Sequence, residues 1–192
     1  ENRVIDLSQE YIYGINREEN PSHGLKIYHE EANNGDPAAA SFLGQAYEEG
    51  TLIPKSIVKS INYYKKAMDG KDKFGTYRYA MALIKGEFKE GGPNEADIKD
   101  GFTILKKISE QVTDCFILGP EAMIELGELY EKGKFHSDKF GLFTMPIDLK
   151  SAINCYEIAR SKQVPRASNN LGVLYVNNKF LNESNPNSKV ET

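Results

Sequence analysis

One short pattern recurs along the chain and constrains its fold more than any other feature. The segments LGQAYEEG at 43–50, LGELYEKG at 126–133 and LGVLYVNN at 171–178 are nearly the same. Each begins with a leucine and a glycine and has a tyrosine at its fifth position. Because internal repetition is the signature of proteins built from stacked supersecondary units, the pattern predicts a repeat architecture.

Two weaker copies lie 36 residues before and 36 residues after Leu43. They share the order of a large apolar residue, a small residue, a second large apolar residue and a glycine: Leu7, Ser8, Tyr11 and Gly14, then Tyr79, Ala80, Leu83 and Gly86. This spacing places both large side chains on one stripe of an α-helix, with the small residue at its edge. Glycine inside a helix costs about 1 kcal/mol relative to alanine. Its recurrence predicts that the backbone of a neighbouring helix passes close to Gly44, Gly127 and Gly172.

A second helix is predicted after each of the first four copies. Ser56, Asp97 and Asp148 each precede a stretch with helical spacing of apolar residues, and such residues suit a helix N-cap. An earlier stretch, SHGLKIYHEEANNG from Ser22, belongs to the same class. The sequence therefore predicts an all-α protein, a right-handed α-solenoid of about nine helices in four antiparallel pairs with one unpaired last helix. No segment has a convincing strand pattern.

The predicted repeats follow the copies of the motif and form one solenoid domain from 1 to 178: roughly 1–35, 36–71, 72–112, 118–162 and a partial copy at 163–178. Inserted residues are expected at three places: 87–96, around 109–120 and 134–147. Residues 179–192 are polar and are predicted to be a tail or linker. Because the chain does not begin with methionine, we expect it to be a piece of a longer protein.

The residues now support a resemblance. The pattern A-x-x-x-L-G-x-x-Y-x-x-G is present at 39–50 and at 122–133, and MPIDLKSAINCYEIA resembles the second half of a Sel1-like repeat. Over about residues 3–178 the chain is similar to a run of Sel1-like repeats, which are relatives of tetratricopeptide repeats. The resemblance implies a role in assembling protein complexes. Sel1-like proteins serve as subunits of endoplasmic-reticulum degradation complexes, as activators of membrane enzymes and as bacterial host-interaction factors.

Composition and motifs give no support to catalysis, a cofactor or a metal. The net charge of −4 argues against nucleic acid, and no apolar run is long enough for direct membrane insertion. The three histidines have no metal-ligand spacing, and neither a phosphate-binding loop nor a nucleophile elbow is present. Cys115 and Cys155 are interpreted as structural thiols, with a bridge between them left open. The sequence indicates no cellular compartment.

A partner-binding surface is predicted on the first helix of each pair. Residues two before, two after and five after the motif leucine are expected to face away from the stack and to line a concave face. Several of them are apolar, which favours an exposed groove, although the insert at 134–147 could cover it or the face could be wrongly assigned. The candidate partner-binding residues are Gln45, Glu48, Phe74, Tyr77, Met81, Ile84, Ile124, Glu128, Val173 and Val176. The motif tyrosines Tyr11, Tyr47, Tyr130 and Tyr175 are instead predicted to pack between helices.

These features favour a non-catalytic protein–protein interaction adaptor. It would hold a partner's extended peptide or helix on the concave face or on the 134–147 insert, and nearby glutamates predict some basic residues in that segment. Two alternatives stay open: a structural spacer in a large assembly, and a β-lactam-binding or β-lactam-hydrolysing Sel1-like protein. The chain lacks the paired cysteines of the latter group. The apolar flank of the last helix, 165–177, needs a cover from another repeat, the tail or a neighbouring protein.

Overall fold

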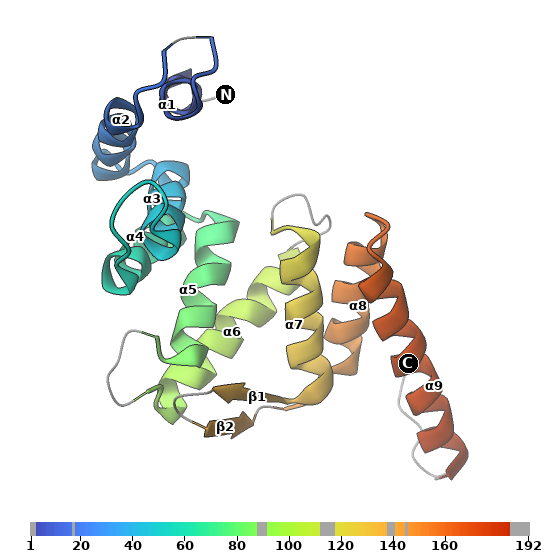
Figure 1. The fold of residues 1–192 in the computed structure, drawn as a ribbon. Helices are drawn as coiled ribbons and strands as arrows, with labels where there is room; N and C mark the ends of the chain where they lie inside the picture. The colour runs from blue at the N-terminus through green and yellow to red at the C-terminus, as the bar shows by residue number, and fades with distance from the viewer. Residues whose placement is uncertain are drawn as a thin grey trace. The chain divides into compact units, whose positions relative to one another are not determined.

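The computed structural model describes residues 3–16, 18–87, 92–111, 118–137, 141–144 and 146–184. Within these ranges the chain forms nine α-helices and one β-hairpin (Figure 1). Their bounds are α1 Arg3–Tyr13, α2 Pro21–Asn33, α3 Pro37–Glu49, α4 Ile57–Asp69, α5 Lys73–Lys85, α6 Glu95–Gln111, α7 Pro120–Lys132, β1 Lys134–Ser137, β2 Gly141–Thr144, α8 Leu149–Arg160 and α9 Pro165–Ser184. The predicted all-α solenoid class is confirmed, with a small hairpin added to it.

Local signals in the sequence set most helix ends. Gly50, Gly86 and Gly133 end α3, α5 and α7 in the left-handed conformation, with φ values of 75°, 65° and 56°. The side chains of Ser56 and Asp148 accept hydrogen bonds from the first turns of α4 and α8, as predicted. At α6 the prediction was wrong, because Asn94 and Asp97 accept each other's backbone N–H groups. This reciprocal arrangement is a capping box, with Asn94 in the cap position.

The chain divides into two compact units, Glu1–Ile108 and Ser109–Thr192. The first unit contains the helix pairs α1–α2, α3–α4 and α5–α6, and Leu43 and Ala67 lie in its buried core. Burial of such apolar side chains supplies the main driving force for the stack, at about 25 cal/mol per Å² of apolar surface. The apolar stripe predicted for the first helices therefore lies in the hydrophobic core, as Leu43 shows.

The second unit contains α7, the hairpin, α8 and α9. Helix α8 packs on α7, and α9 packs on α8 and α7. Strands β1 and β2 are antiparallel, with Lys134 opposite Thr144. The expectation that no strands form was wrong for the insert at 134–147. Its strands have only four residues each, which is too short for an alternating apolar pattern to stand out.

The last helix differs from the expectation at its end. Helix α9 continues past the predicted solenoid boundary at 178 and ends at Ser184. The rest of the predicted tail, 185–192, lies outside the described residues. None of the described helices combines the length and the hydropathy that a bilayer crossing requires.

Candidate interaction surface

Gly44 and Gly127 each make room for a tyrosine ring from the second helix of the same pair. A Cβ atom on Gly44 would lie 2.5 Å from the ring of Tyr64, and one on Gly127 would lie 2.5 Å from the ring of Tyr156. The predicted close approach is confirmed at both glycines, but the neighbour is an aromatic side chain instead of helix backbone. We call a motif glycine in this position, where the missing side chain leaves room for an aromatic ring, a glycine seat.

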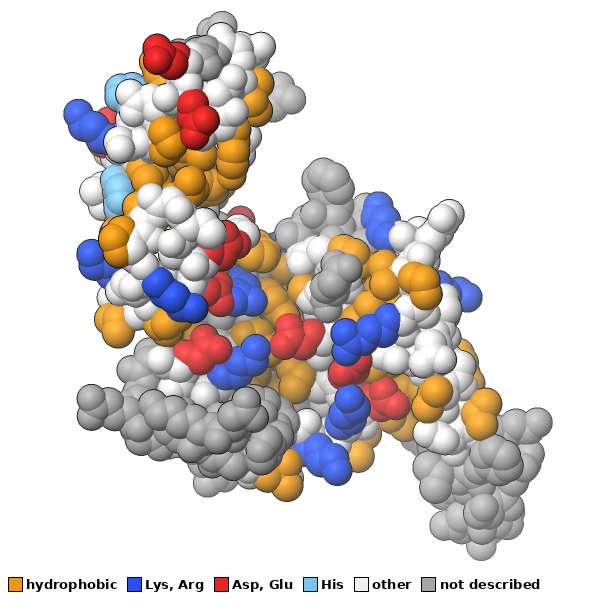
Figure 2. Space-filling view, in the orientation of Figure 1, with side chains coloured by type: hydrophobic (Ala, Val, Ile, Leu, Met, Phe, Trp, Pro, Cys, Tyr) orange, Lys and Arg blue, Asp and Glu red, His pale blue; other side chains and the backbone are white. Residues whose placement is uncertain are grey.

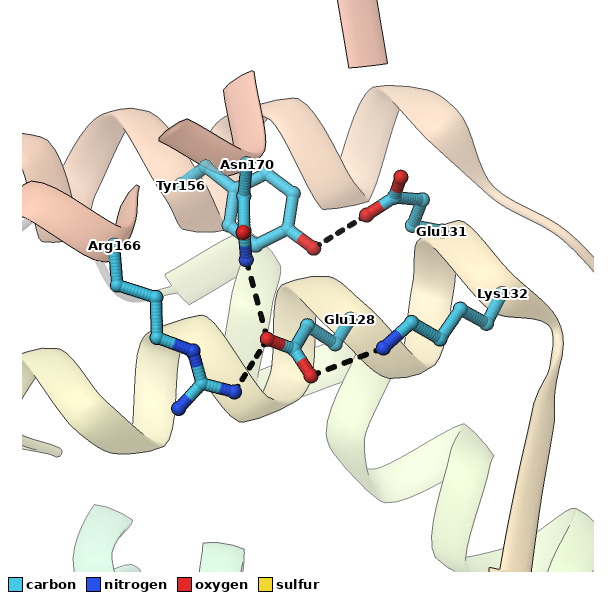
Figure 3. Close-up of polar contacts among 6 residues, drawn as sticks. All are labelled: Glu128, Glu131, Lys132, Tyr156, Arg166 and Asn170. Carbon is cyan, nitrogen blue, oxygen red and sulfur yellow. Dashed lines mark hydrogen bonds and ion pairs between the residues drawn. The ribbon is translucent and has the colours of Figure 1, made fainter. Parts of the chain in front are cut away.

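Each seated tyrosine also reaches a glutamate on the first helix. The Tyr64 hydroxyl donates to Glu48 Oε2 at 2.7 Å, and the Tyr156 hydroxyl donates to Glu131 Oε2 at 2.7 Å (Figure 3). Burial raises the pKa of both phenols, and the bond to Glu131 adds to the effect on the pKa of Tyr156. Glycine, tyrosine and glutamate therefore form one packing unit that occurs twice.

The other two pairs in the first unit pack in a different way. Ser8 and Ala80 stand where the glycines would be, and the glycine lies on the second helix instead. A Cβ atom on Gly24 would lie 2.6 Å from Ile12, and one on Gly101 would lie 2.6 Å from Ile84. These isoleucines occupy the motif position that holds Glu48 and Glu131 in the first kind of pair. The chain thus uses two kinds of helix pair with different close contacts.

Four of the candidate partner-binding residues are buried, so the predicted groove is wrong at these positions. Tyr77, Met81, Ile84 and Ile124 are at most 3% exposed. Ile84 lies one helical turn after the small motif residue, so it faces the second helix of its own pair. Ser41, two residues before the leucine of α3, donates its hydroxyl to Asp72 at the start of α5, at 2.6 Å. The face was wrongly assigned at these four positions, because their side chains are buried.

The two candidate glutamates are engaged within the chain. Glu48 forms an ion pair with Arg78 in addition to its bond from Tyr64. Glu128 accepts from Arg166 at 2.5 Å and from Lys132 and Asn170 at 3.2 Å each (Figure 3). Burial alone would raise the pKa of Glu128, but these three hydrogen bonds outweigh it and lower the pKa. The chain's own cations compensate both carboxylates, which weakens the reason to expect a basic partner.

The remaining candidates divide between the surface and partial burial. Phe74 is half-buried with its ring edge-on to Tyr64, and Gln45 is exposed. Val173 and Val176 on α9 are 47% and 52% exposed. Of the motif tyrosines predicted to pack between helices, Tyr175 is 52% exposed, so that prediction was wrong for the last copy.

An uncovered face of α9 is the clearest surface feature of the second unit. Ala167, Leu171 and Leu174 are buried on the opposite side of the helix. The uncovered side is lined by Ser168, Asn169, Gly172, Val173, Val176 and Asn177, which together form a shallow hollow; we call it the α9 face. Figure 2 shows hydrophobic side chains exposed over α9. A Cβ atom on Gly172 would meet nothing within 4 Å, contrary to the predicted close approach.

The first unit has a cluster of aromatic and basic side chains that sequence reasoning missed. The rings of Tyr47 and Tyr63 are stacked at 5.7 Å, and His29 Nδ1 lies 3.0 Å from the Tyr63 hydroxyl. The Lys59 ammonium lies over Tyr47 and the Lys66 ammonium over Tyr63, at 5.1 and 5.2 Å from the ring centroids. These residues lie on α2, α3 and α4, so the cluster ties two helix pairs together. His29 and Tyr64 occupy equivalent positions in their repeats, and this equivalence gave no indication that His29 contacts Tyr63.

His29 makes the stability of this cluster dependent on pH. Burial lowers the pKa of His29, and the charges of Lys59 and Lys66 lower it further. The unfolded chain therefore binds the proton first as the pH falls below about 6.5, and the folded state loses stability from there downward. We expect the free energy of unfolding to fall between pH 7 and pH 5 in the wild type, and to fall less in His29→Gln. Urea denaturation at both pH values measures the difference, and equal losses would contradict this assignment.

Metal and thiol chemistry find no support in the described part of the chain. No group of three or more histidine, cysteine, aspartate or glutamate side chains could hold a metal ion there. Cys155 is a buried free thiol, and burial followed by the charge of Asp148 raises its pKa to about 12. A thiol with so high a pKa is a poor nucleophile, since the thiolate is the reactive form. Cys115 lies outside the described residues.

Comparison with known proteins supports this architecture. The Sel1 repeat family model matches residues 37–72 and 120–163. A Sel1 repeat protein from Oxalobacter formigenes superposes with a TM-score of 0.64 at 22% identity, over 90% of this chain and 62% of that one. The protective antigen c5321 of uropathogenic Escherichia coli, which displays an SLR fold, superposes with a TM-score of 0.68 at 19% identity, over 91% of this chain and 33% of that one.

The similarity to these two structures supports the fold alone. The chain spans less than two thirds of the length of either structure. Both matched segments contain the glycine–tyrosine–glutamate unit: Gly44 with Tyr64, and Gly127 with Tyr156. In general, Sel1 repeat proteins mediate protein–protein interaction. The chain is an α-solenoid whose segments 37–72 and 120–163 match the Sel1 repeat.

Proposed function

We propose that this chain is a non-catalytic adaptor that holds a segment of a partner protein on the α9 face. The observation that carries the proposal is the exposure of Val173 and Val176 beside an unfilled glycine seat. Exposed apolar patches that are rimmed by polar residues mark interaction sites, and Ser168, Asn169 and Asn177 form such a rim. The general role of Sel1 repeats in protein interaction supports the same reading.

The hairpin is a second candidate surface for the same function. Leu142 on β2 is 62% exposed, and Ile147, which follows the hairpin, is 61% exposed. Both lie in the 134–147 insert, which sequence analysis singled out as a place for a partner. A short two-stranded hairpin also leaves outer backbone groups able to pair with an added strand. The α9 face is preferred because the motif glycines equivalent to Gly172, which are Gly44 and Gly127, lie against tyrosine rings, whereas nothing lies within 4 Å of a Cβ atom placed on Gly172.

The test is capture from a native lysate with three variants of the full chain. Val173→Asp/Val176→Asp alters the α9 face, Leu142→Asp alters the hairpin, and Val58→Asp is a matched control because Val58 is 62% exposed on α4. Substitution of exposed valines should leave folding intact, which circular dichroism checks. We expect at least one protein to be captured by the wild type and the control but lost from the α9 variant. Identical capture by all four chains would favour the spacer alternative.

A further inference from the structure

We propose that the cluster of His29, Tyr47, Lys59, Tyr63 and Lys66 binds an extended acidic segment of a partner protein, whose carboxylates pair with the two lysines. We call this surface the basic cluster. It lies on α2, α3 and α4 of the first unit, whereas the α9 face lies in the second unit. The inference therefore goes beyond the proposed function and does not depend on it.

The two lysines of the basic cluster have no carboxylate partner among the described residues. Their neighbour Lys65 forms an ion pair with Asp69 at 3.2 Å, so the pairing of charges on α4 leaves out Lys59 and Lys66. Both of these lysines are exposed. Positive charges without a counter-charge attract an acidic segment and speed its association with the surface.

The tyrosine rings position both ammonium groups. The Lys59 ammonium lies 5.1 Å from the centroid of the Tyr47 ring, and the Lys66 ammonium lies 5.2 Å from the centroid of the Tyr63 ring. The two rings stack on each other at 5.7 Å and are partly buried, so they form a fixed support. Attraction between a cation and an aromatic face orders a lysine side chain. Binding then costs less side-chain entropy than it would at freely rotating lysines.

The spacing of the lysines selects the kind of segment that fits. Lys59 and Lys66 are two turns apart on one face of α4, which is about 10 Å along a helix that rises about 1.5 Å per residue. An extended peptide rises about 3.3 Å per residue, so carboxylates three residues apart span the same length. Two carboxylates on an extended segment therefore match the pair of lysines better than one small anion does.

The pKa of His29 shows the sign of the electrostatic potential at this surface. Burial lowers this pKa, and the charges of Lys59 and Lys66 lower it further, with no opposing contribution from a described carboxylate. On α2 itself, Lys26 and Glu30 pair at 3.8 Å. The other titratable neighbours are the two tyrosines of the basic cluster, which are uncharged near neutral pH. A bound acidic segment would add negative charge here and raise the pKa of His29.

A separate protein suits the basic cluster better than a further part of the solenoid does. In a stack of repeats, each repeat contacts only its neighbours. The pairs on both sides of α3–α4, which are α1–α2 and α5–α6, are present in the first unit. Further repeats at either end would lengthen the stack without covering this site. The net charge of −4 disfavours nucleic acid as the acidic partner.

The probe is the end-blocked peptide GEGGEG, whose glutamates are three residues apart, and its uncharged control is GQGGQG. NMR of the full chain at millimolar peptide follows the backbone amides of α4 and the ring protons of His29. We expect GEGGEG to shift the α4 signals and to raise the pKa of His29, and GQGGQG to do neither. Both effects should vanish in about 1 M NaCl, where the Debye length is about 3 Å.

Lys59→Gln/Lys66→Gln in the chain removes both proposed contacts. Lys65→Gln is the matched control, because it removes a lysine of the same helix that already has a carboxylate partner. Substitution of exposed lysines should leave folding intact, which circular dichroism checks. We expect the double variant to bind GEGGEG at least about five-fold more weakly than the wild type, and the control to bind it as the wild type does.

Unchanged binding by the double variant, no binding of GEGGEG, or equal binding of GQGGQG would each overturn the inference. Two further results would overturn it by identifying another occupant. One is a single-stranded DNA that binds more tightly than GEGGEG and is lost from the double variant, and the other is a dimer in sedimentation that the double variant dissociates. Val173→Asp/Val176→Asp should bind GEGGEG as the wild type does, so failure of this inference leaves the proposed function standing.

Discussion

Gly127→Ala is expected to destabilise the second unit, and Gly172→Ala is expected to stabilise it, although both replace the same motif residue. A Cβ atom on Gly127 would lie 2.5 Å from the Tyr156 ring, which is fully buried and cannot move aside freely. Overpacking of this kind costs about 1–3 kcal/mol. A Cβ atom on Gly172 meets nothing, so the gain in helix propensity remains, at about 1 kcal/mol.

The measurement is urea denaturation of the full chain, with hydrogen exchange of peptides from α7 and α8 to assign the change to the second unit. The double variant Gly127→Ala/Tyr156→Ala supplies the control. Once the ring is absent, the added methyl group has room, so Gly127→Ala should cost little in that background. A similar loss in both backgrounds would mean that the ring is not what requires the glycine.

Tyr156→Ala is expected to cost about 3–5 kcal/mol of unfolding free energy, because it empties a fully buried ring site. It also removes the donor to Glu131, which leaves a half-buried carboxylate with one contact fewer. Tyr175→Ala is the matched control in the same unit. Its side chain is 52% exposed, so the change should stay within about 0.5 kcal/mol.

The same urea and hydrogen-exchange measurements compare the two tyrosine variants. Tyr156→Phe separates the ring from the hydroxyl, and it should cost about 1 kcal/mol, the size of one net hydrogen bond. A large loss in Tyr175→Ala would show that a further part of the chain covers α9. A small loss in Tyr156→Ala would contradict the glycine-seat explanation of the motif.

Local features of the sequence predicted the helix pairs well. Capping by Ser56 and Asp148 and the left-handed ends at Gly50 and Gly133 depend on residues within one turn of each helix end. The buried stripe through Leu43 follows from helical periodicity alone. These elements were predictable because the physics that decides them is local.

The interaction surface could not be assigned from helix periodicity, since it depends on which helix lies next to which face. Met81 and Ile124 look like exposed apolar residues on a helical wheel, but both are buried by tertiary packing. The sequence does contain a signal for the close helix contacts. At Gly44 and Gly127 the motif glycine occurs together with a glutamate on the first helix and a tyrosine on the second helix. Gly172 and Val176 break that association, which is what distinguishes the last copy.

The two kinds of helix pair restrict how such a chain can evolve. Changing the α5–α6 pair into the kind formed by α3 and α4 requires a glycine at Ala80 and a glutamate at Ile84, together with a tyrosine on α6. Taken singly, the glutamate would place a charge in an apolar contact, and the glycine would open a void. Duplication of whole repeats avoids these intermediates, since the interlocking residues are copied together. Sequence divergence after duplication would then be concentrated in loops such as the hairpin, where no aromatic ring has to pack against a glycine.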